Sequence, residues 1–299
     1  MKKHKICKIL LVILAIFLCV AFYELLGICV AYKKQPEVSN TTKKETKNGS
    51  WNECSENTER AVIIEKNPEA LLQRVRLIKN AKKEIILSTF AFQSDESGKL
   101  ILGALHDAAD RGVHIRLLVD GMESWIDMEG NPYFYGLSSH ENVEIKLYNK
   151  ANPLKPWKMM GRMHDKYLIA DGKRYILGGR NTYNYFLGDF PGHKNYDRDV
   201  LVVCDEPEKE NSVNQLSEYF ETIWNQEDSG YFHNNKKLAN RKSVKNAVLE
   251  LQNSYQKYFE ENKERICETD YTDETFETEK ITLVSNPIHT GSKEPVVWY

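Results

Sequence analysis

The chain has 299 residues, of which 41% are hydrophobic and 28% are charged, which excludes a disordered polymer and fits one large or two modest globular domains. A formal net charge of −2 gives no general attraction to nucleic acid or to an anionic membrane. The six cysteines include no C-x-x-C pair, so neither a zinc site nor a disulfide framework is expected.

The amino-terminal part predicts a membrane anchor. A short basic N-terminus over residues 1–8 precedes an apolar run over residues 9–32, which is interrupted only by Glu24. About 20 apolar residues span a bilayer core. The run is longer than the apolar region of a signal peptide and has no A-x-A-like cleavage site. We therefore expect an uncleaved, single-pass helix, with the main domain outside the cytoplasm.

Residues 33–60 are polar and predict a solvated linker between this anchor and the main domain. The main domain is expected over residues 61–230. Its first elements in chain order are a strand, a helix, a strand, a helix and two further strands: Ala61–Glu65, Ala70–Lys82, Glu84–Phe92, Lys99–Arg111, Val113–Asp120 and Val143–Tyr148. Strand, helix and strand at this spacing indicate parallel pairing in an α/β layer architecture.

A β-hairpin is expected next. Strands over Met163–Ala170 and Tyr175–Gly178 flank the dipeptide Asp171-Gly172, which is a strong hairpin signal. The turn can centre on Asp171-Gly172 or on Gly172-Lys173, and the sequence leaves both registers open.

In the first register His164 faces Gly179, and in the second it faces Asn181. Side chains alternate between the two faces of a strand, so His164 and Lys166 point the same way. Both registers therefore place His164, Lys166 and Asn181 on one face of the hairpin.

The rest of the chain predicts helices and a final strand. Helices are expected over Gln215–Gln226 and Arg241–Arg265, the second within a charged helical segment at residues 231–275. In the tail, residues 276–299, the string KITLVSNP echoes AVIIEKNP at the start of the main domain. This echo favours the beginning of a second, truncated repeat.

The side chains of the hairpin suit a phosphoryl group. Histidine can act as a nucleophile near neutral pH, and His164 is the candidate. Lys166 would supply a point charge for phosphate, and the Asn181 amide would donate to a phosphoryl oxygen. Gly178 and Gly179 would leave room for the substrate beside the strand.

The fixed spacing of these residues resembles the HKD motif of the phospholipase D superfamily, and most of all its cardiolipin synthase branch. The matching positions are His164, Lys166, Asp171, Gly178, Gly179 and Asn181. The segments 86–99, 108–121 and 195–202 are also similar, so the resemblance covers about residues 61–224. Many members have Ser where this chain has Gly179.

The resemblance implies an α-β-α sandwich with a mixed, largely parallel central sheet, and a reaction that needs no metal or cofactor. His164 would attack phosphorus to form a phosphohistidine, which an alcohol or water then resolves. Lys166 and Asn181 would hold the phosphoryl oxygens.

The family pattern also implies roles for acidic residues. Asp171 would orient the hairpin. Asp199 would bond the nucleophilic histidine, with Asp197 as the alternative.

Family members use two such motifs, and one is present here. The expected function is phosphodiester transfer or hydrolysis on phospholipids, with phosphatidylglycerol as the substrate and no nucleic acid. The second half-site would come from a homodimer or from a missing carboxyl-terminal half, and the isolated chain is expected to be mostly monomeric with little turnover. Two alternatives stay open: a homodimeric single-motif nuclease, and a membrane-tethered fragment that is catalytically incomplete.

Overall fold

The computed structural model describes residues 2–33, 59–158, 161–204, 211–233 and 235–285. Almost all of the predicted linker, and the last part of the tail, lie outside these ranges.

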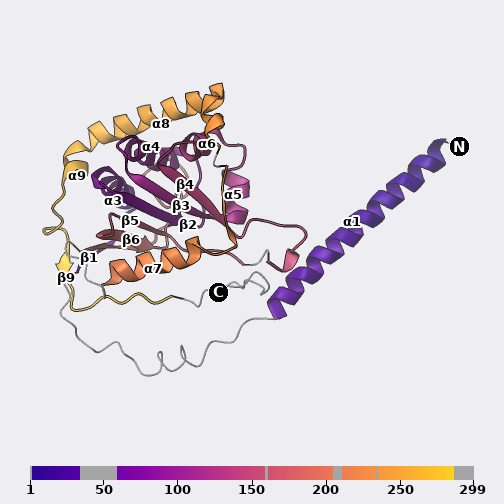
Figure 1. The fold of residues 1–299 in the computed structure, drawn as a ribbon, viewed down its shortest axis with the longest axis horizontal. Helices are drawn as coiled ribbons and strands as arrows, with labels where there is room; N and C mark the ends of the chain where they lie inside the picture. Colours follow the sequence, from indigo (N-terminus) through magenta and orange to yellow (C-terminus); the bar gives the residue numbers. More distant parts are fainter. Residues whose placement is uncertain (1, 34–58, 159–160, 205–210, 234, 286–299) are drawn as a thin grey trace.

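The described part of the chain forms one nine-stranded sheet in the order β8-β4-β3-β2-β5-β6-β7-β1-β9 (Figure 1). The bounds of its strands are β1 Arg60–Ile64, β2 Glu84–Thr89, β3 His114–Asp120, β4 Val143–Tyr148, β5 Tyr167–Ala170, β6 Arg174–Gly178, β7 Asp199–Val203, β8 Ser229–Tyr231 and β9 Phe276–Glu277. The sheet therefore extends beyond the expected domain boundary at residue 230.

The pairing confirms a mixed sheet, but the expectation that it is largely parallel is wrong. Only β2, β3 and β4 pair in parallel, because helices cross over between them. All other neighbours are antiparallel, including the consecutive strands β5, β6 and β7. The short connection between β5 and β6 can join only antiparallel strands.

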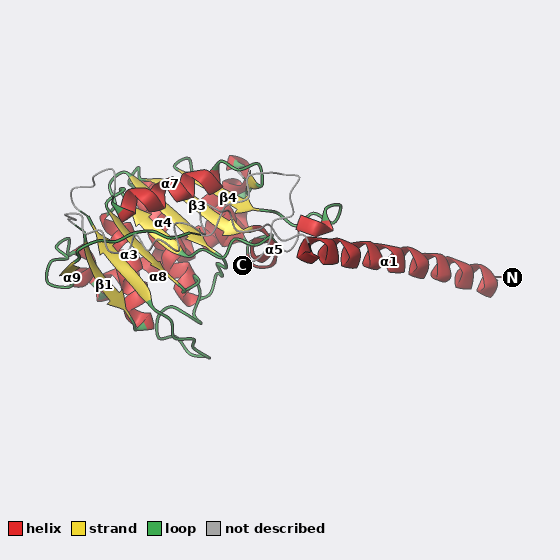
Figure 2. Ribbon diagram, turned by 90° about the horizontal axis from the view of Figure 1, so that it is seen from below, coloured by secondary structure: helices red, strands yellow, loops and turns green. Residues whose placement is uncertain are grey.

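Helices cover both faces, which confirms the sandwich (Figures 1 and 2). On one face lie α3 Asn67–Asn80, α4 Glu96–Asp110, α6 Pro132–Ser138, α8 Lys242–Glu261 and α9 Lys263–Cys267. Their apolar residues share one core with β2–β4. The helices α8 and α9 lie within the segment expected to be charged and helical, and α8 buries its apolar stripe through Val244, Leu251, Tyr255 and Phe259.

On the other face α7 (Ser212–Trp224) packs against a second core. Its Leu216, Phe220 and Trp224 pack there with Tyr167 and Tyr175 from the hairpin. Aromatic side chains bury a large apolar area, so they anchor this helix on the sheet.

The tail continues along this second core. Residues 280–285 form no strand in the structure, so the expected strand at KITLVSNP is not formed over its described part. Instead Ile281 and Leu283 pack against the second core, and the Leu283 amide donates to the Gln215 side chain at 2.8 Å. Contacts with α7 thus hold these residues in place.

The first helix, α1 (Lys2–Lys33), projects away from this domain (Figures 1 and 2). Its stretch His4–Gly27 is long and apolar enough to cross a membrane by length and composition, and its residues from His4 to Tyr23 are exposed.

The strand order and directions bring the ends of several strands to the same edge of the sheet. Strand β5 is antiparallel to β2, so it begins where β2 ends, and β7 likewise begins where β6 ends. We call this edge the site edge: the carboxyl ends of β2, β3, β4 and β6 and the amino ends of β5 and β7. In open α/β sheets ligands bind outside the carboxyl ends of the parallel strands.

Candidate active site

The hairpin register differs from both registers expected from the sequence. Ala170 pairs with Arg174 and Tyr167 with Leu177, so three residues, not two, form the turn. Asp171 and Gly172 take φ of 54° and 63°, which lets the chain turn with this extra residue. The predicted cross-strand geometry is therefore wrong, because a shift of one residue moves every side chain to the other face.

Asn181 reaches the site edge through a loop. The chain leaves β6 after Gly178, and Thr182 pairs with Phe92 beyond the end of β2. The Asn181 Oδ1 atom accepts a hydrogen bond from the Ala91 amide at 3.2 Å. This contact fixes the amide beside the end of β2.

Phe90 is the common neighbour of the two cationic candidates. The His164 ring lies edge-on to the Phe90 ring, with centroids 4.7 Å apart, and Lys166 Nζ lies 5.1 Å from the same centroid. His164 precedes β5 and is exposed, whereas Lys166 is buried. The Lys166 ammonium also donates to the His164 carbonyl at 2.6 Å. His164, Lys166 and Asn181 thus gather around residues 90–91.

The surroundings lower the pKa of both His164 and Lys166. Partial burial, and then the charge of Lys166, lower the pKa of His164 from its ordinary value of 6.5, and Asp120 opposes them. Burial lowers the pKa of Lys166 to about 8 against the pull of Asp165, Asp197 and Asp120. A neutral imidazole is the form that can attack phosphorus.

Asp120, at the end of β3, fixes the chain just before His164. It is buried, and its Oδ2 accepts from the Met163 amide at 3.0 Å while its Oδ1 accepts from Arg162 Nε at 2.9 Å. The Arg162 guanidinium also lies 4.8 Å from the Phe90 ring centroid. Asp120, Arg162 and Phe90 were not predicted as site residues. The available signal was an aspartate at the carboxyl end of a buried parallel strand.

We expect Asp120→Asn to lower kcat/KM by about 10²-fold, because a small displacement of a reacting group has an effect of this size. The amide cannot accept from both Met163 and Arg162, so the segment before His164 shifts. Steady-state kinetics would measure the effect. Glu123→Gln is the matched control, since Glu123 also pairs with Arg162 at 2.8 Å but does not hold the Met163 amide. Equal activity of the two variants would contradict this role.

Asp199 does not contact His164, so the bond expected between them is not formed. Its Oδ2 pairs with Arg74 at 2.8 Å and with Arg180 at 3.2 Å, and all three side chains are buried. Its Oδ1 accepts no hydrogen bond from the described part of the chain. Arg180 further donates to the Ile64 and Glu65 carbonyls. Asp199 therefore belongs to a buried ion cluster that joins β7, α3 and the end of β1.

Asp197 lies closer to the phosphate-binding candidates. A methyl group built on Gly179 would lie 2.1 Å from the Asp197 carboxylate, and the Asp197 charge acts on Lys166. At Gly178 such a methyl would lie 2.0 Å from Asp199 and 2.5 Å from the Arg198 carbonyl. Both glycines thus allow an aspartate to approach the backbone.

We expect Gly178→Ala to lower the free energy of unfolding by about 1–3 kcal/mol, the usual cost of overpacking. The Arg198 carbonyl beside Gly178 belongs to the backbone and cannot move away without disturbing β7. Gly179→Ala should have a smaller effect, because the Asp197 side chain can rotate. Denaturant unfolding of both variants would measure this difference, and a greater loss for Gly179→Ala would contradict the packing.

Asp171 lies at the other end of β5 from His164. Its carboxylate accepts from the backbone amides of Lys82, Lys83 and Glu84 at 2.7–3.1 Å. It therefore ties the hairpin turn to the start of β2 and takes no part in the group around Phe90.

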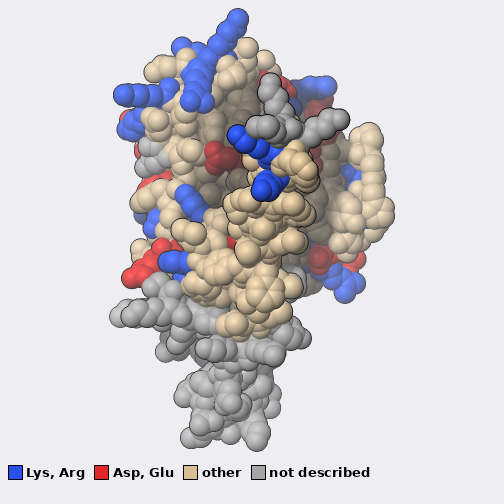
Figure 3. Space-filling view, turned by 90° about the vertical axis from the view of Figure 1, so that its right-hand side faces the viewer, with Lys and Arg blue, Asp and Glu red and all other residues tan. Residues whose placement is uncertain are grey.

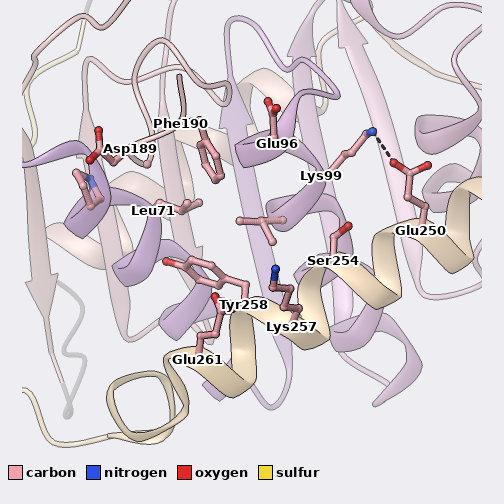
Figure 4. A pocket seen from close by; sticks show the side chains of 13 residues that line it. Leu71, Glu96, Lys99, Asp189, Phe190, Glu250, Ser254, Lys257, Tyr258 and Glu261 are labelled. Atoms are coloured by element: carbon pink, nitrogen blue, oxygen red, sulfur yellow. Dashed lines mark hydrogen bonds and ion pairs between the residues drawn. The ribbon is translucent and has the colours of Figure 1, made fainter. Parts of the chain in front are cut away.

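One cavity of about 510 Å³ lies among α3, α4, α8 and the loop at residues 188–190 (Figure 4). Lys99 from α4 pairs there with Glu250 from α8 at 2.6 Å. The lining side chains include no residue of the group around Phe90, so this cavity is not where the expected chemistry would occur.

Comparison with known proteins defines the class. A family model described as the phospholipase D-like domain of cardiolipin synthase matches residues 74–224. The chain therefore belongs to the phospholipase D superfamily, whose members act on phosphodiesters.

Curated relatives agree with this assignment. An uncharacterized protein of Helicobacter pylori (strain J99) is 30% identical over 212 residues, which cover 66% of this chain and 39% of that protein. Cardiolipin synthase C of Escherichia coli (strain K12) is 30% identical over 154 residues, which cover 47% of this chain and 31% of that protein. The chain thus spans less than half the length of these relatives.

Among solved structures, NucT from Helicobacter pylori is similar, with a TM-score of 0.46 and 17% identity; the match covers 58% of this chain and 99% of that one.

Proposed function

We propose that this chain supplies one half-site of a membrane-anchored phospholipid phosphodiesterase or phosphatidyltransferase that works through a phosphohistidine. The observation that carries the proposal is the gathering of His164, Lys166 and Asn181 around residues 90–91 at the site edge. The superfamily assignment supports the reaction type, and the apolar helix α1 supports a lipid substrate.

The proposed reaction has two steps. A nitrogen of the His164 imidazole attacks phosphorus, the bond from phosphorus to the leaving oxygen breaks, and the leaving alkoxide takes a proton from a separate acid. An alcohol or water then attacks the phosphohistidine and gives its proton to the group that served as the acid, and the bond from phosphorus to nitrogen breaks, which restores the free imidazole. Lys166 and the Asn181 amide stabilise the charge on the phosphoryl oxygens.

The proton donor requires a second half-site. One imidazole cannot attack phosphorus and also protonate the leaving group on the opposite side. A second copy of this chain, or a further segment of a longer protein, would supply the donor. Light scattering of the detergent-solubilised chain would distinguish a dimer from a monomer, and an active twofold dimer would favour the first source.

The substrate is tested by incubating the purified chain in mixed micelles containing phosphatidylglycerol. Where the second half-site is present, we expect release of a headgroup, or formation of cardiolipin together with free glycerol. The chain is near neutral overall and lacks the excess of basic residues typical of a nuclease. Salt-sensitive cleavage of single-stranded DNA without lipid turnover would instead establish a nuclease.

A further inference from the structure

Three exposed apolar side chains lie on the side of the domain from which α1 departs. Trp125 and Ile126 belong to α5 (Gly121–Asp127) and are 65% and 66% exposed. Leu154 lies in the loop after β4 and is 78% exposed. Figure 1 shows this loop at the base of α1, and Figure 2 shows α5 on the same side of the domain. We call Trp125, Ile126 and Leu154 the apolar rim.

Contacts with α1 show which part of the apolar helix lies beside this rim. The Tyr23 hydroxyl donates to the Leu154 carbonyl at 2.9 Å. Gly27, the last residue of the apolar stretch, lies against Pro156 in the short 3-10 helix η2 (Pro156–Lys158), because a methyl group there would meet its ring at 2.4 Å. Tyr23 is four residues before Gly27, or about 6 Å along the helix. Leu154 therefore lies level with the last turn of the apolar stretch.

A cavity lies between α1, α5 and the loop after β4, and Trp125 is the residue of the apolar rim that lines it. It has a volume of about 740 Å³, and residues from α1, α5 and the loop after β4 line it, including Glu24, Trp125 and Pro153. Figure 3 views the molecule from this side, with α1 projecting toward the reader in front of the domain; its apolar residues form the tan surface in the middle of the view.

Two lysines flank the exposed loop. Lys150 and Lys155 are exposed on either side of residues 151–154. Basic residues beside an apolar loop suit an anionic lipid surface, since the cations meet headgroups while the apolar residues enter the acyl boundary. Tyrosine and tryptophan also favour this boundary, which fits Tyr23 and Trp125.

The rim and the candidate site share the site edge. Helix α5 follows directly on β3, whose last residue Asp120 accepts from Arg162 and from the Met163 amide. Arg162 also pairs with Glu123 in the first turn of α5. The chain before His164 is therefore held against the helix that carries Trp125 and Ile126.

We propose that Trp125, Ile126 and Leu154 enter the headgroup–acyl boundary of the membrane that α1 crosses, and that this contact directs the site edge toward lipid phosphates. The proposal deepens the proposed function and depends on its membrane anchor. The partner is a lipid bilayer surface containing anionic phospholipid.

Depth measurement on the full chain in liposomes of phosphatidylcholine and phosphatidylglycerol tests the contact. A bimane label at Ile126→Cys or Leu154→Cys would report quenching by nitroxide lipids, with cysteines other than the buried Cys204 replaced by alanine. The control is Leu249→Cys on α8, at a residue 58% exposed. We expect at least about threefold stronger quenching at 126 and 154 than at 249. Equal quenching at all three positions would overturn the proposal.

A second variant tests the consequence for lipid turnover. Trp125→Ser with Ile126→Ser should lower turnover of phosphatidylglycerol in liposomes by about tenfold and leave cleavage of soluble bis(p-nitrophenyl) phosphate unchanged. Unchanged lipid turnover would overturn the directing role. If the chain cleaves neither substrate but the labels are quenched as expected, the proposed function fails while the membrane contact stands.

Discussion

Replacing His164 with alanine should lower phosphodiester turnover by more than about 10⁴-fold in whatever assembly is active, because it removes the nucleophile and with it the covalent route. The exposed imidazole beside Phe90 is the group that we expect to carry the phosphoryl intermediate. Rapid quenching of a reaction with ³²P-labelled lipid should yield acid-labile phosphate on the unmodified chain and none on His164→Ala.

His114→Ala is a matched control. His114 is the first residue of β3, at the opposite edge of the sheet, and pairs with Glu144 at 3.0 Å. This variant should keep near-normal turnover and incorporate label. If His164→Ala retained turnover within a few-fold of the unmodified chain, the assignment of the nucleophile would be wrong.

Lys166→Ala should lower kcat/KM by about 10²–10³-fold, the range found when a donor to a developing oxyanion is removed. The titration of Lys166 should also be visible in the dependence of turnover on pH. Lys166 is charged below its pKa of about 8, so turnover should fall as pH rises through that value. On the acid side turnover should rise as His164 loses its proton, at a pH below 6.5.

Two variants test whether Lys166, and not another group, causes the fall in turnover at alkaline pH. Lys166→Arg keeps a charge at every accessible pH, so its residual turnover should lose the decline near pH 8. Lys173→Ala, in the exposed turn at the far end of the hairpin, should leave the profile unchanged. An alkaline decline that persists in Lys166→Arg would assign it to another group.

The sequence could predict the first half of the sheet because apolar strand runs and amphipathic helices follow one another closely there. The strand expected at Val143–Tyr148 has those bounds in the structure, and the strands before it differ by a few residues at most. Short apolar runs separated by segments with helical periodicity predict strands that alternate with helices. The short helices α5 and α6 carry too few residues to show a period, and they were not predicted.

The hairpin shows where sequence reasoning fails. The residue types of the site could be named, but their placement depends on how many residues the turn takes. Asp171 adopts a left-handed φ in a three-residue turn, which shifts the register by one. Asn181 still reaches the site because its loop pairs with the end of β2. The partners of Asp199 depend on α3, which is distant in sequence and leaves no local signal.

The boundary between β2 and β5 is a seam in the sheet, because the strands on each side of it come from one nearly continuous stretch of sequence. Strands β2, β3 and β4 come from residues 84–148, and β5, β6 and β7 from residues 167–203. Phe90 lies on one side of this seam and His164 on the other, so each stretch alone holds an incomplete site. Local opening of a folded protein can separate such units without unfolding either. Any loosening of the seam would remove the site first, while most of the secondary structure stayed intact.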